Sequence, residues 1–433
     1  MDAASQTSGG NPPEISYTAQ VASPLFSGEA TLAVGTDDLA VTALFDAAEI
    51  PYADMTALRA ADYAVTVQTE GGDFVFSRMG SWLRPFFDAL SEAYNKKVLK
   101  ALFVTGSPLL TAQGVYRYAE NGAVTGGTAP VRLFDDCVCT LPTDLHARRI
   151  PLCFLTGLDK GDYEITLRLS ERESYTLSKL GYDTAPFADA LEKRLRALRE
   201  KALTAVKELD PSLSAMQAAA VARLMPEGAA VLSGQLSALA PSFLEAIKSK
   251  IDAGRAAETY RAFCELCNPS QIYIGFKKNT APAAGAAAET EGVPPEDAGT
   301  LPGNLPLGLP DGEAPEESDP YMLWMIAPSP DGKSCAVEFA GDPEDAAATF
   351  VYRFDGAFDD FAAQLNRALE AIAFKRLAIR LSDEELLRPE HADCRMAVQR
   401  NPSLRFVRAC FAGRIIHSGS WRRKLSDMWG LGS

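Results

Sequence analysis

The chain has 433 residues, 47% of them hydrophobic, which exceeds what one hydrophobic core usually serves and predicts roughly three domains at ~150 residues each. Its formal net charge of −15 disfavours a protein whose whole surface binds nucleic acid or anionic lipid. No stretch approaches the ~18 apolar residues of a membrane helix, the first residues have no leader-like pattern, and the eight cysteines are scattered as reduced thiols are, so we expect a cytoplasmic protein.

The first half of the chain contains an internal duplication. The segment "IPYADMTALRAADYAVT", which begins at Ile50, returns as "IPLCFLTGLDKGDYEIT" from Ile150. Further on, "SRMGSWLRPFFDAL" matches "SKLGYDTAPFADAL", and the offset between the copies grows from 100 to 101 residues. This change predicts one inserted residue in a turn between two strands of the second copy.

Each copy predicts antiparallel strands followed by one helix. The segments "YAVTVQT" and "DFVFSRM", and their counterparts "YEITLRL" and "SYTLSKL", alternate apolar and polar residues as hairpin strands do. Apolar residues then recur at helical spacing, at Leu83, Phe86, Leu90, Tyr94 and Val98 in one copy and at Phe187, Leu191, Leu195, Leu198 and Ala202 in the other. We therefore expect two α+β modules, residues 16–100 and 101–209, each with an antiparallel sheet covered by a closing helix.

The strand order, the early acidic pairs Asp37-Asp38 and Asp135-Asp136, and the closing helix resemble the pleckstrin-homology superfold. The resemblance implies a curved antiparallel sandwich closed at one open end by a C-terminal helix, and a role in binding other proteins. Phosphoinositide-binding members carry Lys and Arg around the first hairpin, where this chain is acidic, which argues against lipid headgroups. Neighbouring residues of a strand point to opposite faces, so the acidic pairs are interpreted as turn residues and not as catalytic dyads.

Residues 210–268 predict a helical connector, from "SAMQAAAVARLM", "PSFLEAIKSKI" and "AAETYRAFCELC". Cys264 and Cys267, with His391 and Cys394 further on, are two pairs at the spacing that zinc ligands use. Neither pair has the flanking glycines or basic residues common in zinc ribbons, and small core residues on a helix account for the cysteines. We expect no metal and no cofactor, and a metal-dependent enzyme is kept as the second alternative function.

Residues 269–385 predict a degraded third module of the same kind. The strands are "QIYIGFKK", "YMLWMIAPS", "KSCAVEFAG" and "ATFVYRF", and the helix follows in "FDDFAAQLNRALEAIAFKR". Residues 279–319 interrupt the module with nine acidic residues, no basic ones and many Ala, Pro and Gly, and are predicted to be a disordered insertion. The segment "APSPDGKS" at 327–334 fits a relaxed phosphate-loop pattern, but such a loop must open a helix, so a β-turn is predicted instead.

The chain offers few candidates for a catalytic histidine, because it contains three histidines. His146 lies close to Asp144, in a loop where the second copy is two residues longer than the first, so an Asp–His pair is conceivable. No nucleophile signature accompanies it, and a solvated loop histidine is the favoured interpretation.

Residues 386–433 form a basic C-terminal tail. Between residues 395 and 426 there are eight basic residues and no acidic ones, interleaved with aromatic residues. We expect the tail to fold back on acidic surface of its own chain. The alternative is contact with an acidic partner, nucleic acid or an anionic surface. The candidate partner-binding residues are Arg405, Arg408, Arg414, Trp421, Arg422, Arg423 and Lys424.

Together these observations predict a non-enzymatic cytoplasmic scaffold or adaptor with a protein partner. The alternative function is a binder of nucleic acid or an anionic surface through the tail.

Overall fold

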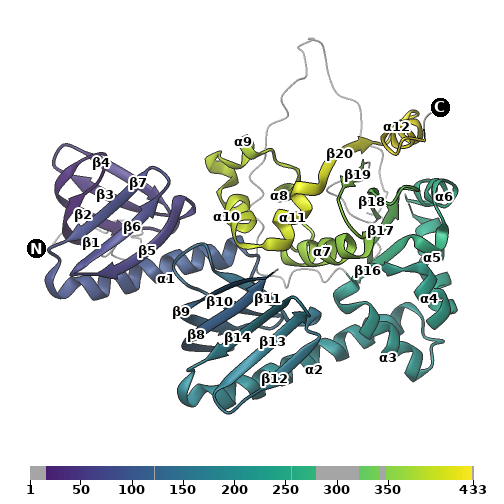
Figure 1. Ribbon diagram of the computed structural model, residues 1–433, viewed down its shortest axis with the longest axis horizontal. Coiled ribbons are helices and arrows are strands. Elements are labelled where there is room, and N and C mark those ends of the chain that lie inside the picture. Colours follow the sequence, from purple (N-terminus) through teal and green to yellow (C-terminus); the bar gives the residue numbers. More distant parts are fainter. Residues whose placement is uncertain (1–15, 121, 255, 279–320, 341–347, 432–433) are drawn as a thin grey trace, which may run out of the picture. The chain divides into compact units, whose positions relative to one another are not determined.

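The computed structural model describes residues 16–120, 122–254, 256–278, 321–340 and 348–431 (Figure 1). The fold is α+β, with antiparallel sheets and helices, as the sequence predicts. Two compact units divide the chain: unit 1 comprises residues 1–204, 331–335 and 350–413, and unit 2 comprises residues 205–330, 336–349 and 414–433. The predicted insertion at 279–319 lies outside the described residues.

The first module, in unit 1, is a seven-stranded antiparallel sheet with the order β4-β3-β2-β1-β7-β6-β5, closed by helix α1. Its elements are β1 (Ser16–Ala22), β2 (Ser27–Val34), β3 (Asp38–Ala43), β4 (Ala47–Pro51), β5 (Met55–Ala61), β6 (Ala64–Thr69), β7 (Gly72–Ser77) and α1 (Leu83–Ala101). The stripe predicted on the helix is the buried one, since Phe86, Leu90, Tyr94 and Val98 have no exposed surface. These side chains join the core under the sheet.

The second module, also in unit 1, has the same strand order, β11-β10-β9-β8-β14-β13-β12. Its elements are β8 (Leu110–Glu120), β9 (Ala123–Leu133), β10 (Cys137–Thr140), β11 (Arg148–Pro151), β12 (Gly157–Lys160), β13 (Glu164–Ser170), β14 (Glu173–Ser178) and α2 (Thr184–Leu209). Phe187 and Leu191 of α2 are fully buried against the sheet, and Leu195 and Leu198 are partly buried there. The predicted pair of antiparallel sheets, each followed by a closing helix, is confirmed.

The strand registers agree with the duplication and correct it in two places. Ala64 pairs with Ser77 and Glu164 with Ser178, but Thr69 pairs with Gly72 and Ser170 with Glu173, so the two turns have equal length. The extra residue is a β-bulge between Arg168 and Ser170 in β13, and not an insertion in the turn as predicted. Further upstream, the sequence alignment matches Asp37-Asp38 to Asp135-Asp136, and this match is wrong by one residue. The N–H of residue 52 donates to the carbonyl of Asp37 and that of residue 152 to the carbonyl of Asp136, so Asp37 corresponds to Asp136 and not to Asp135.

The loop between β10 and β11 is therefore one residue longer than its counterpart, and not two as the alignment indicated. Asp38 faces Pro51 across the β3–β4 hairpin, and Cys137 faces Pro151 across the β10–β11 hairpin. Sequence identity alone places an alignment gap poorly here, because the acidic pairs Asp37-Asp38 and Asp135-Asp136 are offset by one position between the two turns.

Strand β10 is buried on both faces. Val138 packs in the core of the second module, whereas Cys137 and Cys139 pack in the core of the first, together with Met396. This double burial explains why "CVCT" lacks the alternation of a strand with one wet face. All eight cysteines lie among the described residues, and none of them forms a disulfide bond.

The remaining helices of unit 1 come from the C-terminal part of the chain. They are α7 (Phe358–Ala371), α8 (Leu377–Arg380), α9 (Asp383–Leu386), α10 (Ala392–Arg400) and α11 (Pro402–Cys410). Asn401 caps α11, because its side-chain oxygen accepts the N–H of Leu404 at 2.9 Å. The first half of the predicted basic tail is thus helical.

Unit 2 contains helices in the segment where the sequence predicts a connector, and one helix of the C-terminal tail. Its helices are α3 (Ala215–Leu224), α4 (Ser233–Leu239), α5 (Pro241–Ala253), α6 (Ala257–Leu266) and α12 (Trp421–Met428). Between α3 and α4, Gly228 has a φ of +81°, and a Cβ there would lie 1.7 Å from the carbonyl oxygen of Phe276, so only glycine fits. The indole N–H of Trp324, which is fully buried, donates to the carbonyl of Gly228 at 3.2 Å.

The third sheet has six strands in consecutive order, β15-β16-β17-β18-β19-β20. They are β15 (Val231–Leu232), β16 (Tyr273–Lys278), β17 (Tyr321–Pro328), β18 (Ser334–Ala340), β19 (Ala348–Arg353) and β20 (Phe411–Ile416). All of β17 and β18 is buried, in keeping with their nearly continuous apolar sequence. This order differs from that of the two modules, and a third module at 269–385 remains a proposal.

Candidate functional site: an arginine-rich pocket

A small pocket in unit 1 is lined by four arginines. Arg148 and Arg149 belong to β11, Arg367 to α7 and Arg400 to the end of α10. The pocket has a volume of about 30 Å³, which is room for about two water molecules. It is therefore too small for a substrate of ordinary metabolite size, and the feature of interest is the set of side chains that line it.

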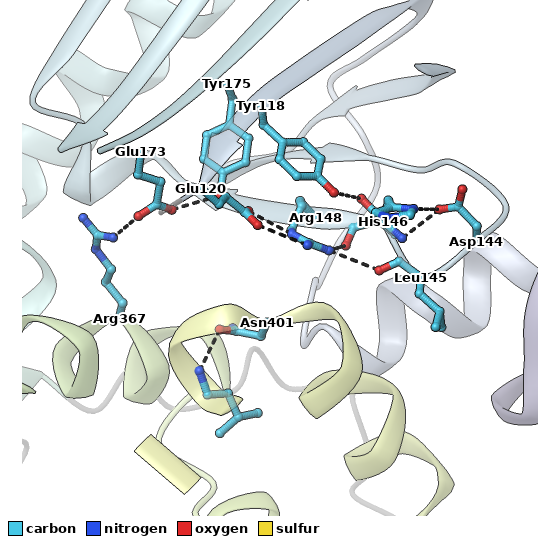
Figure 2. Close-up of polar contacts among 12 residues, drawn as sticks. Tyr118, Glu120, Asp144, Leu145, His146, Arg148, Glu173, Tyr175, Arg367 and Asn401 are labelled. Atoms are coloured by element: carbon cyan, nitrogen blue, oxygen red, sulfur yellow. Dashed lines mark hydrogen bonds and ion pairs between the residues drawn. The ribbon is translucent and has the colours of Figure 1, made fainter. Parts of the chain in front are cut away.

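Arg148 is held by a carboxylate and by carbonyl groups (Figure 2). Its Nε and Nη2 donate to the two carboxylate oxygens of Glu120, at 2.9 and 3.2 Å, and its Nη1 donates to the carbonyls of Leu145 and Ala147. The guanidinium also lies over the ring of Tyr118, 4.9 Å from its centre. Burial is the largest single effect and opposes the charged form, but the hydrogen bond to Glu120, its negative charge, and Tyr118 and Tyr175 together outweigh burial and raise the pKa of Arg148.

Tyr175 connects this pair to the next one. Its hydroxyl lies 2.8 Å from a carboxylate oxygen of Glu120 and 2.9 Å from one of Glu173, so both acids compete for its proton. Glu173 in turn pairs with Arg367 of α7 (Figure 2). Arg367 also donates to the carbonyl of Leu169. Burial, followed by the two negative charges, raises the pKa of Tyr175, so the hydroxyl stays protonated and acts as a donor.

Arg149 makes the most deeply buried pair of the pocket. Its Nη1 and Nη2 donate to the carboxylate of Glu370 on α7 at 2.6 and 2.8 Å, and Nη2 also donates to Asp136 at 2.9 Å. The side chains of Arg149 and Glu370 are 4% and 8% exposed. A buried two-point pair of this kind leaves a strongly unfavourable charge if either partner is removed.

Arg400 joins the closing helix of the first module to the second module. It donates to the hydroxyl of Tyr94 on α1 at 2.6 Å, and that hydroxyl donates to the carbonyl of Asp144 at 3.3 Å. Both side chains are fully buried or nearly so. The network therefore ties both sandwiches and the C-terminal helices of unit 1 together.

The arrangement is suited to holding elements together and not to proton transfer. Each carboxylate of the pocket is hydrogen-bonded to a guanidinium. Burial raises the pKa of Tyr118 to about 12, so this phenol does not ionise near neutral pH. General acid–base catalysis needs a group whose pKa lies near the working pH, and this pocket offers none among its tyrosines.

The Asp144–His146 pair considered from the sequence does form, but it has a structural role. The imidazole Nδ1 lies 3.2 Å from the Asp144 carboxylate, which also accepts the backbone N–H of His146 at 2.7 Å (Figure 2). This is the geometry of an Asp side chain that stabilises its own loop. The loop serves as a connector, because Thr143 exchanges two hydrogen bonds with Leu58 of β5.

The two pairs of zinc-ligand candidates lie in different units. Cys264 and Cys267 lie on and just after α6 in unit 2, whereas His391 and Cys394 lie at α10 in unit 1. Burial raises the pKa of the Cys267 thiol to about 12, and it also raises the pKa of Cys264 and Cys394. Over the residues that the structure describes, no group of three or more His, Cys, Asp and Glu side chains is placed to hold a metal ion.

The phosphate-loop-like segment forms the turn between β17 and β18, as predicted. Gly332 has a φ of +69°, the Asp331 side chain accepts the N–H of Lys333 at 3.1 Å, and a strand follows. No helix N-terminus is therefore available at this turn to bind a phosphate.

The tail residues fall into two groups. Arg408 donates to the carbonyl of Ala378 and pairs with Asp383, Arg422 pairs with Glu265, and Trp421 is buried with its N–H donating to Thr349. The side chains of the other candidates are exposed, namely Arg405, Arg414, Arg423 and Lys424. Arg405 and Arg408 belong to unit 1, and the other five candidates belong to unit 2.

Sequence reasoning missed the arginine-rich pocket. A usable signal was the divergence of the two copies at one position pair, since Ala48 and Glu49 of the first copy correspond to Arg148 and Arg149 of the second. A strand that gains two adjacent arginines where its twin has none indicates a new contact on that edge.

No protein-family model matches this sequence, and no curated protein matches it. Among solved structures, the Spt16D Pob3N heterodimer is similar over 39% of this chain and 97% of that chain, at 11% sequence identity and a TM-score of 0.15. A likeness at this TM-score says nothing about function. Within the described residues, no helix is long and apolar enough to cross a membrane.

Proposed function

We propose that this chain is a non-enzymatic, cytoplasmic protein-interaction scaffold built from pleckstrin-homology-like modules. The observation that carries the proposal is that each module exposes two large aromatic side chains at the same end of its sheet. Tyr63 and Trp82 are exposed in the first, and Tyr163 and Tyr182 in the second. The ring of Trp82 also meets that of Tyr17 in the first core edge-on, with the ring centres 6.2 Å apart.

The two members of each pair lie at the same end of their sheet, next to the ends of two neighbouring strands. Tyr63 precedes β6, whose first residue faces the last residue of β7, and Trp82 follows β7 by a short connection. In the second module, Tyr163 precedes β13 as Tyr63 precedes β6, whereas Tyr182 takes the place of Ser81, one residue before the place of Trp82. Rigid aromatic side chains give large contact area at low entropic cost, which is why they dominate protein interfaces.

The backbone at Tyr63 supports a functional role. This residue has a φ of +59° in the turn and is 92% exposed, although a bulky residue is disfavoured in the left-handed region. Glycine or asparagine would relieve this strain. An exposed aromatic kept at such a position is expected where a partner contacts it.

Two further features support a non-enzymatic, cytoplasmic role. The arginines of the pocket are paired with carboxylates and tie the modules together, so the pocket contributes to rigidity. The eight cysteines form no disulfide bond, which fits a reducing compartment.

The test is affinity capture with the full-length chain from cells that produce it, followed by mass spectrometry. A variant with Tyr63, Trp82, Tyr163 and Tyr182 each changed to Ser should lose specific partners that the parent retains. The control changes Leu109 and Leu387, which are exposed elsewhere in unit 1, to Ser. Identical partner sets for the parent and the aromatic variant contradict the proposal.

A second candidate is contact with a polyanion through the tail. It is supported by Arg423 and Lys424, which are neighbouring exposed residues on α12, and by Arg405, exposed on α11. Changing all three to Ser should then reduce binding of a duplex oligonucleotide, and log K for the parent should fall with log salt by about 0.9 per phosphate neutralised. If the parent does not bind the duplex oligonucleotide even at low salt, this candidate function is rejected.

A further inference from the structure

The β10–β11 loop contacts strand β5. Within the described residues, the structure shows no such contact for the duplicated parts, namely the β3–β4 turn and strand β12. In the chain itself, the β10–β11 loop meets β5, the terminal strand of the first sheet. The N–H of Leu58 donates to the carbonyl of Thr143 at 2.8 Å, and the Thr143 hydroxyl donates to the carbonyl of Leu58, also at 2.8 Å. Ala57 and Asp144 form an antiparallel bridge beside them.

The second module presents the same edge at β12, the terminal strand of its own sheet. Leu158 pairs with Leu167 just as Leu58 pairs with Val67, so the two leucines have the same register. Because donors and acceptors alternate along an antiparallel strand, the N–H and C=O of Leu158 point away from the sheet, as those of Leu58 do. An outward pair of this kind is a template for another chain.

The first module presents the matching loop at the β3–β4 turn. Counted along the registers of β3 and β10, Leu44 takes the place of Thr143. Leu44 and Phe45 are 84% and 90% exposed, and Leu25 on the β1–β2 turn, at the same end of the sheet, is 69% exposed. Three large apolar side chains gathered at one end of a module mark an interaction site.

We propose that the β3–β4 turn of one copy docks on the β12 edge of a second copy of this chain. The occupant is a second copy because the chain carries both unused halves of a contact that it already makes internally. Main-chain hydrogen bonds to Leu158 give the register, and burial of Leu44 and Phe45 adds affinity.

The resulting association is head-to-tail. The turn and the edge lie on different modules, so the two surfaces in contact are not the same on both copies, and each added copy offers a new edge. This self-association goes beyond the proposed function and does not depend on the aromatic pairs that support it.

The test measures the mass of the full chain by sedimentation over its whole soluble concentration range. The parent should rise above the monomer mass of 46.5 kDa with concentration. The variants Leu44→Ser/Phe45→Ser, which removes the turn's apolar side chains, and Leu158→Pro, which removes the outward N–H, should each stay monomeric. Proline is tolerated on an edge strand where the N–H faces outward, and an unchanged melting temperature verifies folding.

Mixing the two variants makes the test specific. The turn variant retains a functional edge and the edge variant retains a functional turn, so an equimolar mixture should form a species of twice the monomer mass and nothing larger. The control Leu387→Ser removes an exposed leucine elsewhere in unit 1 and should associate like the parent. A parent that stays monomeric at every concentration, variants that associate as the parent does, or a mixture without dimer overturns the proposal.

Discussion

The Arg149–Glu370 pair offers the sharpest test of how unit 1 is held together. Replacing Arg149 by Met removes both hydrogen bonds to Glu370, whose side chain is 8% exposed, and leaves that carboxylate buried without a cation. Removing one partner of a buried ion pair typically lowers the free energy of unfolding by about 3–5 kcal/mol. We expect a loss in that range for Arg149→Met.

The reasoning also predicts how the loss can be recovered. Adding Glu370→Leu to Arg149→Met removes the stranded charge and fills the space with apolar atoms. Since apolar replacement of a whole buried pair is often neutral or stabilising, the double variant should be more stable than either single variant. The matched control is Arg84→Met, because Arg84 and Asp88 form an exposed pair, and such pairs contribute about 0.3–0.5 kcal/mol.

The assay is urea unfolding of the full chain, followed by circular dichroism. Because a chain of two units need not unfold in one step, hydrogen exchange of the β11 and α7 amides assigns the affected transition to unit 1. A loss for Arg149→Met no larger than that for Arg84→Met, or a double variant no more stable than the single ones, would refute the reasoning.

Three further changes probe the same unit. Tyr94→Phe removes a buried hydroxyl that bridges two elements, and should lower the free energy of unfolding by about 1–3 kcal/mol in urea titrations. Thr143→Val removes the hydrogen bond to Leu58 and should speed hydrogen exchange of β5, while β2 exchange stays unchanged. The hydrogen bond from Lys97 lowers the pKa of Asp37, so its stabilisation is present above the unfolded-state pKa and is lost as pH falls through the folded-state pKa; Asp37→Asn should therefore flatten the acid side of the stability–pH curve.

Local pattern was sufficient to predict the two modules. The alternation of "YAVTVQT" and the helical spacing of Phe86, Leu90 and Tyr94 are set by which residues must face an apolar core, and that information is local in the chain. The segment repeated at Ile50 and Ile150 predicted the same architecture for both modules, and their matching strand orders confirm it. The helices of the connector were likewise predicted from their spacing, except for α4, which is too short to show a period.

The pocket and the joints between elements were decided by tertiary structure. Arg149 and Glu370 are 221 residues apart, and neither residue differs in local context from an ordinary surface charge. The same holds for the meeting of Thr143 with Leu58 and for the burial of both faces of β10. The sequence by itself determined which face of each element is apolar, because one side chain's affinity for water is a property of that residue. Only the tertiary structure decided which charges meet, because the energy of an ion pair depends on a distance and a burial that exist only once the chain has folded.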